Sequence, residues 1–258
     1  MAFRYMSNPQ VRKLREFEEE VLAQSSQEVF RFRGFDIQSY FWGLEGNPVI
    51  FLVHGWEGQA GNFGALVQLL LDKGYYVIAF DGPSHGRSTK APTSMFEYAD
   101  LITEMIGKYR PTRIISHSFG TVTSVFGLLN NPEVHLEQWF IITTPSNFKD
   151  RIEGVKKTIG VGHRTVKRLI RLLEDSTGHK IDDMNVDTMG PQLKNAKEVV
   201  LIHSRADKII PIEDSRKAQR ALPNAELMEL DELGHYKILW SDELKDILAK
   251  RLRSYVEA

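Results

Sequence analysis

The chain of 258 residues contains no cysteine. Disulfide bonds, thiolate zinc sites, iron–sulfur clusters and a cysteine nucleophile are therefore excluded. The sequence also lacks an excess of charge of one sign, because 33 Lys and Arg residues oppose 34 Asp and Glu residues, for a formal net charge of -1. A dedicated nucleic-acid binder needs a basic surplus to neutralise phosphate groups. The composition thus predicts that no nucleic acid is a partner.

Long apolar runs are missing as well. The densest run, Val49 to Val53, is far too short to cross a bilayer, for which about 20 residues are needed. Met1 to Pro9 lacks the apolar core that a secretory signal requires. We therefore expect a cytoplasmic protein without a transmembrane segment. The content of 42% hydrophobic and 26% charged residues is typical of a globular protein, and the length fits one large α/β domain.

Strand and helix patterns alternate along most of the chain. Strands are expected at 49–53, 75–80, 113–116, 139–143, 198–203 and 225–230, and helices at 63–71, 95–109, 121–129, 212–221 and 241–255. Such alternation predicts an α/β fold with a doubly wound, mostly parallel sheet covered by helices on both faces. Before it, we expect a helix from Asn8-Pro9 to Ala23 and a hairpin from Val29 to Trp42.

The alternation is interrupted between 145 and 193, where we find no strand pattern. We interpret this segment as a helical cap inserted into a single domain that spans 1–258, over the sheet edge where ligands bind in such folds. Eight Lys and Arg residues between 146 and 173 oppose two acids, a local net charge of +6. Two interpretations stay open: a solvated face balanced by the acidic segment 174–187, or a surface that favours anionic esters or anionic lipid.

The strongest local motif lies between a predicted strand and a predicted helix. It is the pentapeptide Ser116-His117-Ser118-Phe119-Gly120. A serine in the middle of such a sharp turn projects its hydroxyl from the sheet, and it needs small residues two positions before and after it. Here the usual first glycine is Ser116, which weakens the match. By itself, the pentapeptide also fits a serine that merely begins a helix.

A serine hydroxyl becomes a good nucleophile only when a base takes its proton and an acid orients that base. Asp207 and His235 each follow a predicted strand, so we expect both at the edge where Ser118 emerges. The chain order Ser118, Asp207, His235 is typical of one class of serine hydrolases. The backbone N–H groups of Trp56 and Phe119 are expected to form the oxyanion hole.

The remaining histidines and acids have simpler interpretations. His54, Asp81 and His85 are expected to support the loops in which they lie. The sequence contains no His-Glu-x-x-His pair and no glycine-rich nucleotide-binding motif. We therefore expect no metal ion, and binding of a nucleotide or dinucleotide has no support in the sequence.

Taken together, these motifs resemble the α/β-hydrolase superfamily, in particular its bacterial, single-domain, esterase-like serine hydrolases. The residues that carry the resemblance are His54 to Gly58, Phe80 to Gly86, His117 to Gly120, Asp207, and Leu233 to His235. The resemblance extends from Val29 to Val256 and implies an eight-stranded sheet, a Ser–His–Asp triad, an acyl-enzyme mechanism and no cofactor. It implies no particular substrate, because this fold hosts many chemistries.

We predict a serine hydrolase that cleaves small-molecule carboxylic esters through an acyl-enzyme on Ser118. A thioesterase, an amidase, a C–C bond hydrolase or an acyltransferase would use the same residues. A dehalogenase or epoxide hydrolase is disfavoured, because those enzymes use a carboxylate in the place of Ser118. The alternative from another class is a non-catalytic binding protein that retains the fold. The sequence leaves the oligomeric state open.

Overall fold

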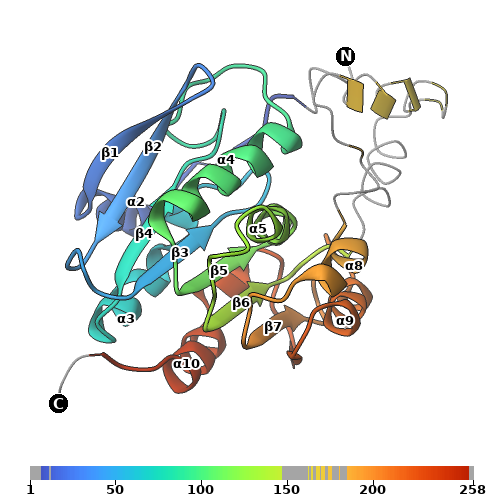
Figure 1. The fold of residues 1–258 in the computed structure, drawn as a ribbon. Helices are drawn as coiled ribbons and strands as arrows, with labels where there is room; N and C mark the ends of the chain where they lie inside the picture. The colour runs from blue at the N-terminus through green and yellow to red at the C-terminus, as the bar shows by residue number, and fades with distance from the viewer. Residues whose placement is uncertain are drawn as a thin grey trace.

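Eight strands form a single sheet with the order β1-β2-β4-β3-β5-β6-β7-β8 (Figure 1). Strand β2 runs antiparallel to both β1 and β4, and every other neighbouring pair is parallel. The strands are β1 (Ser26–Phe32), β2 (Phe35–Trp42), β3 (Val49–Val53), β4 (Tyr76–Phe80), β5 (Arg113–His117), β6 (Gln138–Ile142), β7 (Val199–Ser204) and β8 (Ala225–Leu230). The predicted doubly wound, mostly parallel sheet of eight strands is confirmed.

The computed structural model describes residues 7–11, 13–146, 162, 164, 167–168, 170–171, 174–175, 180 and 185–255. The helices in these ranges are α2 (Glu16–Ala23), α3 (Gly64–Asp72), α4 (Met95–Tyr109), α5 (Phe119–Leu129), α8 (Val186–Met189), α9 (Ile212–Ala221) and α10 (Asp242–Arg251). The described residues also include the short 3-10 helices η1 (Ala60–Phe63), η3 (Gly190–Gln192) and η4 (Lys237–Trp240). No helix among the described residues has the length and apolar character needed to cross a bilayer.

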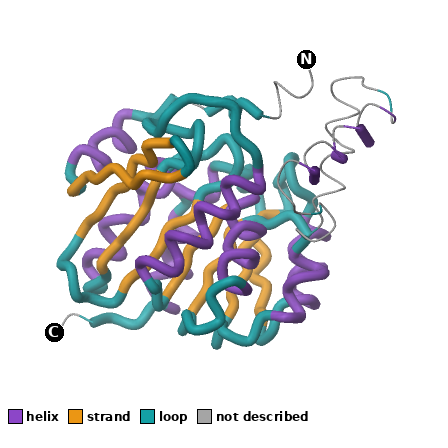
Figure 2. Tube along the Cα trace, turned by 45° about the horizontal axis from the view of Figure 1, so that its top comes forward, coloured by secondary structure: helices purple, strands orange, loops and turns teal. Residues whose placement is uncertain are grey.

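Helices cover both faces of the sheet (Figures 1 and 2). Side chains of α4, α5, α8 and α9 belong to one hydrophobic core, and those of α2, α3 and α10 belong to a second core on the opposite face. Because side chains alternate along a strand, Phe51 and Val53 of β3 join the first core, while Ile50 and Leu52 join the second. Burial on both faces explains why this strand is apolar at every position.

The N-terminal helix is shorter than the sequence predicts. Instead of extending from Asn8 to Ala23, α2 begins at Glu16. The backbone N–H of Arg15 donates to Glu18 Oε2 at 2.7 Å, so the carboxylate of the first turn closes the helix start there. The apolar spacing upstream of this capping contact therefore belongs to non-helical backbone, and the prediction for this stretch is wrong.

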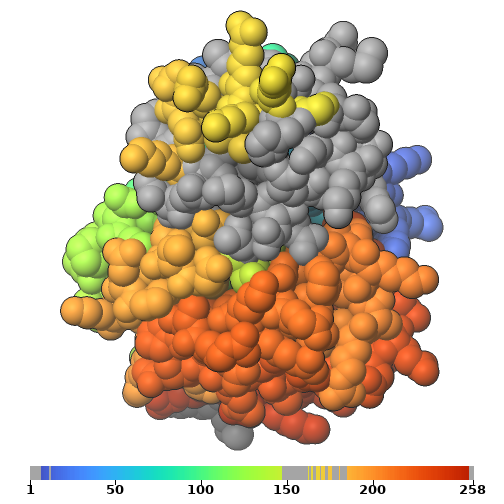
Figure 3. Space-filling model, turned by 90° about the vertical axis from the view of Figure 1, so that its right-hand side faces the viewer, coloured from blue at the N-terminus to red at the C-terminus, as the bar shows by residue number. Residues whose placement is uncertain are grey.

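The predicted cap lies largely outside the described residues. Helices α8 and η3 occupy its C-terminal end, and the described residues that precede them are helical at Arg164, Lys167, Arg168, Ile170, Arg171, Glu174 and Asp175. Ile170 packs against the first core, while the four basic residues of this set are exposed (yellow to gold in Figure 3). At these positions the amphipathic pattern has the expected orientation, but the cap as a whole stays a prediction.

The parallel strands β3 to β8 all end at one edge of the sheet. The loop 54–58 follows β3, Ser118 follows β5, Asp207 follows β7 and His235 follows β8. Residues that are far apart in the sequence are thus delivered to the same edge by the strands alone.

Gly120 lies where α5 passes close to the end of β3, and it offers a test of this packing. A Cβ added at Gly120 would lie 2.4 Å from the carbonyl oxygen of Val53 and 2.6 Å from that of His54. Because backbone atoms cannot rotate away, Gly120→Ala should lower the free energy of unfolding by about 1–3 kcal/mol. Urea denaturation followed by circular dichroism measures this change.

Gly64→Ala is the matched control, since Gly64 also lies in the first turn of a helix and is buried. A Cβ there would meet its nearest neighbour, Glu18 Cα, at an ordinary 3.5 Å. Helix propensity then favours alanine by up to about 1 kcal/mol, so stability should stay unchanged or rise. Equal stability of the two variants would contradict the close approach of α5 to β3.

Candidate active site

Ser118 occupies a strained turn between β5 and α5. Its backbone has φ 55° and ψ -126°, a conformation that L-residues rarely adopt. The turn is held by its N–H, which donates to the carbonyl oxygens of Ile142 at 3.0 Å and Thr143 at 2.7 Å. A Cβ built on Gly55 would lie 2.8 Å from Ser118 Cβ, so the loop after β3 also presses against this residue. The conformation is the one expected of a nucleophile at a strand-to-helix turn.

Ser116 occupies the place of the usual first glycine, and the structure accounts for it. Its hydroxyl oxygen is buried, accepts a hydrogen bond from Trp139 Nε1 at 2.9 Å and lies 3.0 Å from Thr121 Oγ1. The added hydroxymethyl group is therefore satisfied inside the first turn of α5. The departure from the usual motif does not disrupt the turn.

Asp207 and His235 form a hydrogen-bonded pair at this edge. Asp207 Oδ2 lies 2.8 Å from His235 Nδ1, and the two side chains are only 1% and 5% exposed. Burial by itself raises the pKa of Asp207, but the neighbouring imidazoles of His203 and His235 and the hydrogen bond from the Ile210 N–H outweigh it and hold that pKa well below its usual range. The carboxylate is thus ionised at neutral pH and ready to orient an imidazole.

His117 connects this pair to the serine turn. Its Nε2 lies 2.9 Å from the carbonyl oxygen of His235, and the two imidazole rings pack with centroids 4.7 Å apart. His235 is thereby held beside the residue that precedes Ser118. Among the described residues, the Ser118 hydroxyl makes no hydrogen bond, to His235 or to any other group. Such catalytic hydrogen bonds are often long in free enzymes and shorten when substrate binds.

Trp56 and Phe119, the predicted oxyanion residues, lie on two segments that meet at Ser118. Phe119 is the first residue of α5, and Trp56 follows Gly55, whose added Cβ would lie 3.3 Å from Ser118 Oγ. The Trp56 ring packs edge-on against Phe119, with centroids 6.3 Å apart. Within the described part of the chain, the Trp56 N–H has no hydrogen-bond partner. It is therefore available to a ligand.

The loops around the serine are held by buried polar side chains. His54 Nε2 accepts the Gly82 N–H at 2.9 Å, and its Nδ1 lies 2.7 Å from the Gly55 carbonyl oxygen. His85 Nε2 likewise accepts the Glu57 N–H at 3.2 Å. Both imidazoles are occupied by backbone groups, as expected for structural histidines rather than a general base.

Asp81 has a similar supporting role. Its carboxylate accepts hydrogen bonds from the Tyr40 hydroxyl at 2.9 Å and from the N–H groups of Ala60 at 2.9 Å and Arg87 at 2.7 Å. A Cβ at Gly86 would lie 2.1 Å from the Asp81 carboxyl carbon, so only glycine fits there. Asp81 thus ties β2, the start of η1 and the loop after β4 together behind the site, which agrees with the supporting role predicted from the sequence.

Two contributors to the site are not evident in the sequence. Thr143 supplies the 2.7 Å carbonyl contact to Ser118 and has φ 48°, yet no motif marks it. His203 lies at the end of β7, 3.6 Å from Asp207 Oδ2. In the sequence, its position at the end of a predicted strand could have indicated a place near the site. A histidine in an apolar strand, however, also fits a purely structural role.

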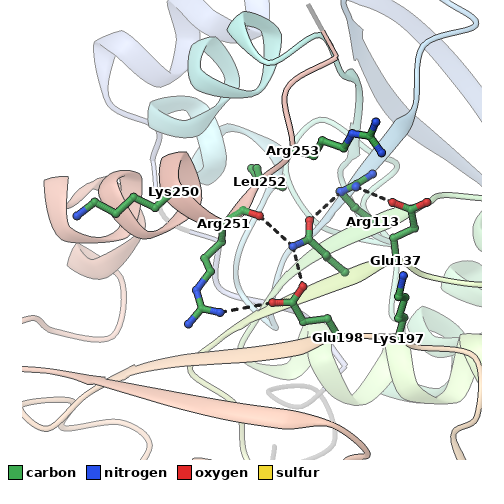
Figure 4. A pocket seen from close by; sticks show the side chains of 9 residues that line it. Arg113, Glu137, Lys197, Glu198, Lys250, Arg251, Leu252 and Arg253 are labelled. Carbon is green, nitrogen blue, oxygen red and sulfur yellow. Dashed lines mark hydrogen bonds and ion pairs between the residues drawn. The ribbon is translucent and has the colours of Figure 1, made fainter.

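A polar pocket lies at the opposite edge of the sheet, away from Ser118 (Figure 4). It has a volume of about 310 Å³ and is lined by Arg113, Glu137, Gln138, Lys197, Glu198, Lys250, Arg251, Leu252 and Arg253. Arg113 begins β5, so it lies about 16 Å from Ser118 along the strand. Gln138 bonds to Arg113, to Glu198 and to the Arg251 carbonyl, which ties the end of α10 to the sheet.

The described residues include no group of three or more His, Cys, Asp or Glu side chains placed to hold a metal ion. The histidines that line the serine turn are engaged with backbone groups or with Asp207 instead.

The buried histidines predict how stability depends on pH. Burial lowers the pKa of His54 to about 4 and holds the pKa values of His85 and His117 well below the usual range. Near pH 6.5, these histidines therefore bind protons in the unfolded chain, whereas in the folded chain they stay neutral. Stability contributed by the neutral ring of His54 is complete above about pH 6.5 and decreases as the pH falls toward about 4, by at most about 1.4 kcal/mol per pH unit.

In His54→Gln, which can still accept the Gly82 N–H, this pH dependence should be smaller. Urea unfolding at pH 7, 6 and 5 measures the slope of stability against pH. His135→Gln is the control, because His135 is exposed and should leave the slope unchanged. An identical slope in wild type and His54→Gln would contradict the neutral, buried state of this ring.

Comparisons with known proteins agree with this geometry. The model of the alpha/beta hydrolase family matches residues 50–249. An uncharacterized hydrolase, YugF, of Bacillus subtilis is 24% identical over 88% of this chain and 97% of its own. A serine hydrolase-like protein of Homo sapiens is 32% identical over 40% of this chain and 53% of its own.

A solved structure shows the same arrangement of elements. The esterase Pf2001 of Pyrococcus furiosus superposes with a TM-score of 0.66 over 95% of this chain and 96% of its own, at 17% identity. This likeness concerns the fold, while the family match extends over most of the chain and includes the loops that carry Ser118, Asp207 and His235. The chain belongs to the alpha/beta hydrolase family.

Proposed function

We propose that the protein is a serine hydrolase that cleaves carboxylic esters through an acyl-enzyme on Ser118. The observation that carries this proposal is the His235–Asp207 hydrogen bond of 2.8 Å at the same sheet edge as a serine held at positive φ. A non-catalytic binding protein has no physical need for a strained serine, an oriented imidazole and an ionised acid together. The combination favours an enzyme over a binding module.

In the first half of the reaction, the Ser118 hydroxyl attacks the ester carbonyl carbon. His235 Nε2 takes the hydroxyl proton as the Oγ–C bond forms. Asp207 holds the opposite ring nitrogen, Nδ1, in its protonated tautomer and stabilises the imidazolium. The imidazolium then gives its proton to the leaving alkoxide, the C–O bond breaks, and the alcohol departs from the acyl-enzyme.

The negative charge on the carbonyl oxygen requires donors that are already in place. The N–H groups of Trp56 and Phe119 are proposed to supply them, because their two segments converge on Ser118. Removing one such donor in comparable enzymes costs about 10²–10³ in rate. The strained turn contributes here, since it positions the N–H that follows the nucleophile.

In the second half, water takes the place of the alcohol. His235 deprotonates the water, which attacks the acyl carbon and forms a second tetrahedral intermediate. The imidazolium returns the proton to Ser118 Oγ as the acyl–oxygen bond breaks, and the carboxylic acid leaves. Every proton is returned, so the cycle needs no cofactor.

Ser118→Ala should lower kcat for p-nitrophenyl ester hydrolysis by roughly a million-fold, because the nucleophile is gone. It should also abolish covalent labelling by a fluorophosphonate probe, which forms an Oγ–phosphorus bond and releases fluoride. Mass spectrometry of the labelled wild type should locate the adduct on Ser118.

The control is Ser26→Ala, at an exposed position on the edge strand β1, which should hydrolyse and label like the wild type. Circular dichroism should show that Ser118→Ala is folded. Wild-type turnover by a folded Ser118→Ala, or a wild type that neither labels nor hydrolyses any ester, would contradict the proposal.

Ester substrates should be preferred to amides with the same acyl group. The machinery is shared, so the comparison of kcat/KM for matched p-nitrophenyl esters, thioesters and anilides of increasing chain length decides the class. A higher kcat/KM for thioesters at every chain length would replace the esterase proposal with a thioesterase.

A further inference from the structure

His203 is a buried histidine that the mechanism above does not use. It lies at the end of β7, is fully buried and contacts groups on three sides. Its Nδ1 is 2.7 Å from the hydroxyl oxygen of Ser215, its Nε2 is 3.1 Å from the carbonyl oxygen of Ile210, and the same Nε2 is 3.6 Å from Asp207 Oδ2. This ring therefore stands directly behind the acid of the His235–Asp207 pair.

The neighbours of His203 determine its tautomer. A carbonyl oxygen can only accept, so the contact with Ile210 requires a hydrogen on Nε2. In the neutral ring, Nδ1 is then the acceptor and takes the hydroxyl hydrogen of Ser215. The Ser215 oxygen lies 3.5 Å from the Thr144 N–H, which leaves the hydroxyl hydrogen free to point at the ring.

Asp207 is held on both of its oxygens. Oδ1 accepts the N–H groups of Ile209 at 2.7 Å and Ile210 at 3.0 Å. Oδ2 faces two imidazoles, that of His235 at 2.8 Å and that of His203 at 3.6 Å. His203 Nε2 thus bonds to the Ile210 carbonyl oxygen, at the end of the turn that carries the carboxylate, and lies within ion-pair distance of Oδ2 itself.

We propose that His203 is a positioning residue for the acid: its Nε2–H holds the Asp207 carboxylate and its turn so that Oδ2 faces His235, and Ser215 fixes the required tautomer. The inference rests on the proposed serine-hydrolase function. Without this donor, the turn 207–210 loses its tie to β7 and the carboxylate loses a partner on the oxygen that orients His235. The imidazolium formed during catalysis is then stabilised less.

Two substitutions separate hydrogen bonding from packing. His203→Leu fills the space but removes both hydrogen bonds, whereas His203→Gln can still donate toward Ile210 and Asp207 and accept from Ser215. We expect His203→Leu to lower kcat by about 10–100-fold with KM little changed. The acid limb of its kcat/KM profile should move to lower pH, because a displaced carboxylate stabilises the imidazolium of His235 less. His203→Gln should restore most of kcat and the wild-type limb.

Ser215→Ala tests the hydrogen bond between Ser215 and His203 Nδ1 from the serine side, and it is a milder change than replacing the ring. It leaves the ring in place but removes the partner of Nδ1, so kcat should fall by several-fold and the acid limb should shift in the same direction. His135→Leu is the control for replacing a histidine by leucine, because His135 is exposed and should change neither kcat nor the pH profile.

A spectroscopic readout is independent of turnover. The hydrogen shared by His235 Nδ1 and Asp207 should give a low-field proton resonance in wild type and His203→Gln, assigned by its loss in His235→Gln. In His203→Leu this resonance should disappear or move upfield. If His203→Leu does not fold, Ser215→Ala and His203→Gln carry the same comparison.

Wild-type kcat, pH profile and low-field resonance in a folded His203→Leu would overturn the inference. Equal impairment of folded His203→Leu and His203→Gln would overturn it too, because shape rather than hydrogen bonding would then be responsible. Failure of the proposed function looks different: the wild type itself would neither hydrolyse esters nor label at Ser118, while the resonance would still report on the Asp207–His235 contact.

Discussion

Parallel pairing of the strands from β3 to β8 is the constraint on which the rest of this structure depends. It brings the ends of β3, β5, β7 and β8 to one edge, so residues that are more than a hundred positions apart become neighbours. The same pairing places the carbonyl oxygens of Ile142 and Thr143 under the N–H of Ser118 and so holds the serine turn. Helices on both faces bury the sheet. The packed surroundings hold the strained turn and the buried charges in place.

Buried polar contacts give the site its order. His54, His85 and Asp81 satisfy the N–H groups of the surrounding loops, and burial lowers the pKa values of both histidines. The Asp207 carboxylate shows the opposite balance, because several hydrogen bonds outweigh the cost of its burial. The imidazoles of His54 and His85, which support loops, are thus kept neutral, whereas the Asp207 carboxylate, which faces His235, is kept ionised at the same sheet edge.

The sequence predicted the elements well where the local pattern and the fold agree. The strand Val49–Val53 and the helix Met95–Tyr109 have the predicted bounds, because their apolar spacing is also their packing. The N-terminal helix was predicted too long, since the contact from Arg15 to Glu18 starts it later than the apolar spacing indicates. Ser116 weakened the sequence motif, yet its hydroxyl is satisfied by Trp139, a residue 23 positions away whose role depends on strand pairing.

By itself, the sequence determined the doubly wound fold, the turn at Ser118 and the order in which Ser118, Asp207 and His235 follow their strands. These features depend on local periodicity and on residues next to strand ends. Only the tertiary structure decided that Asp207 Oδ2 faces both His235 and His203, that His117 packs against His235, and that Thr143 supports Ser118. The reason is physical: the contacts of His235 and Ser118 join the ends of different strands, and the His203–Asp207 contact depends on how the turn after β7 folds back, so all depend on register or side-chain direction, which the hydrophobic pattern does not encode.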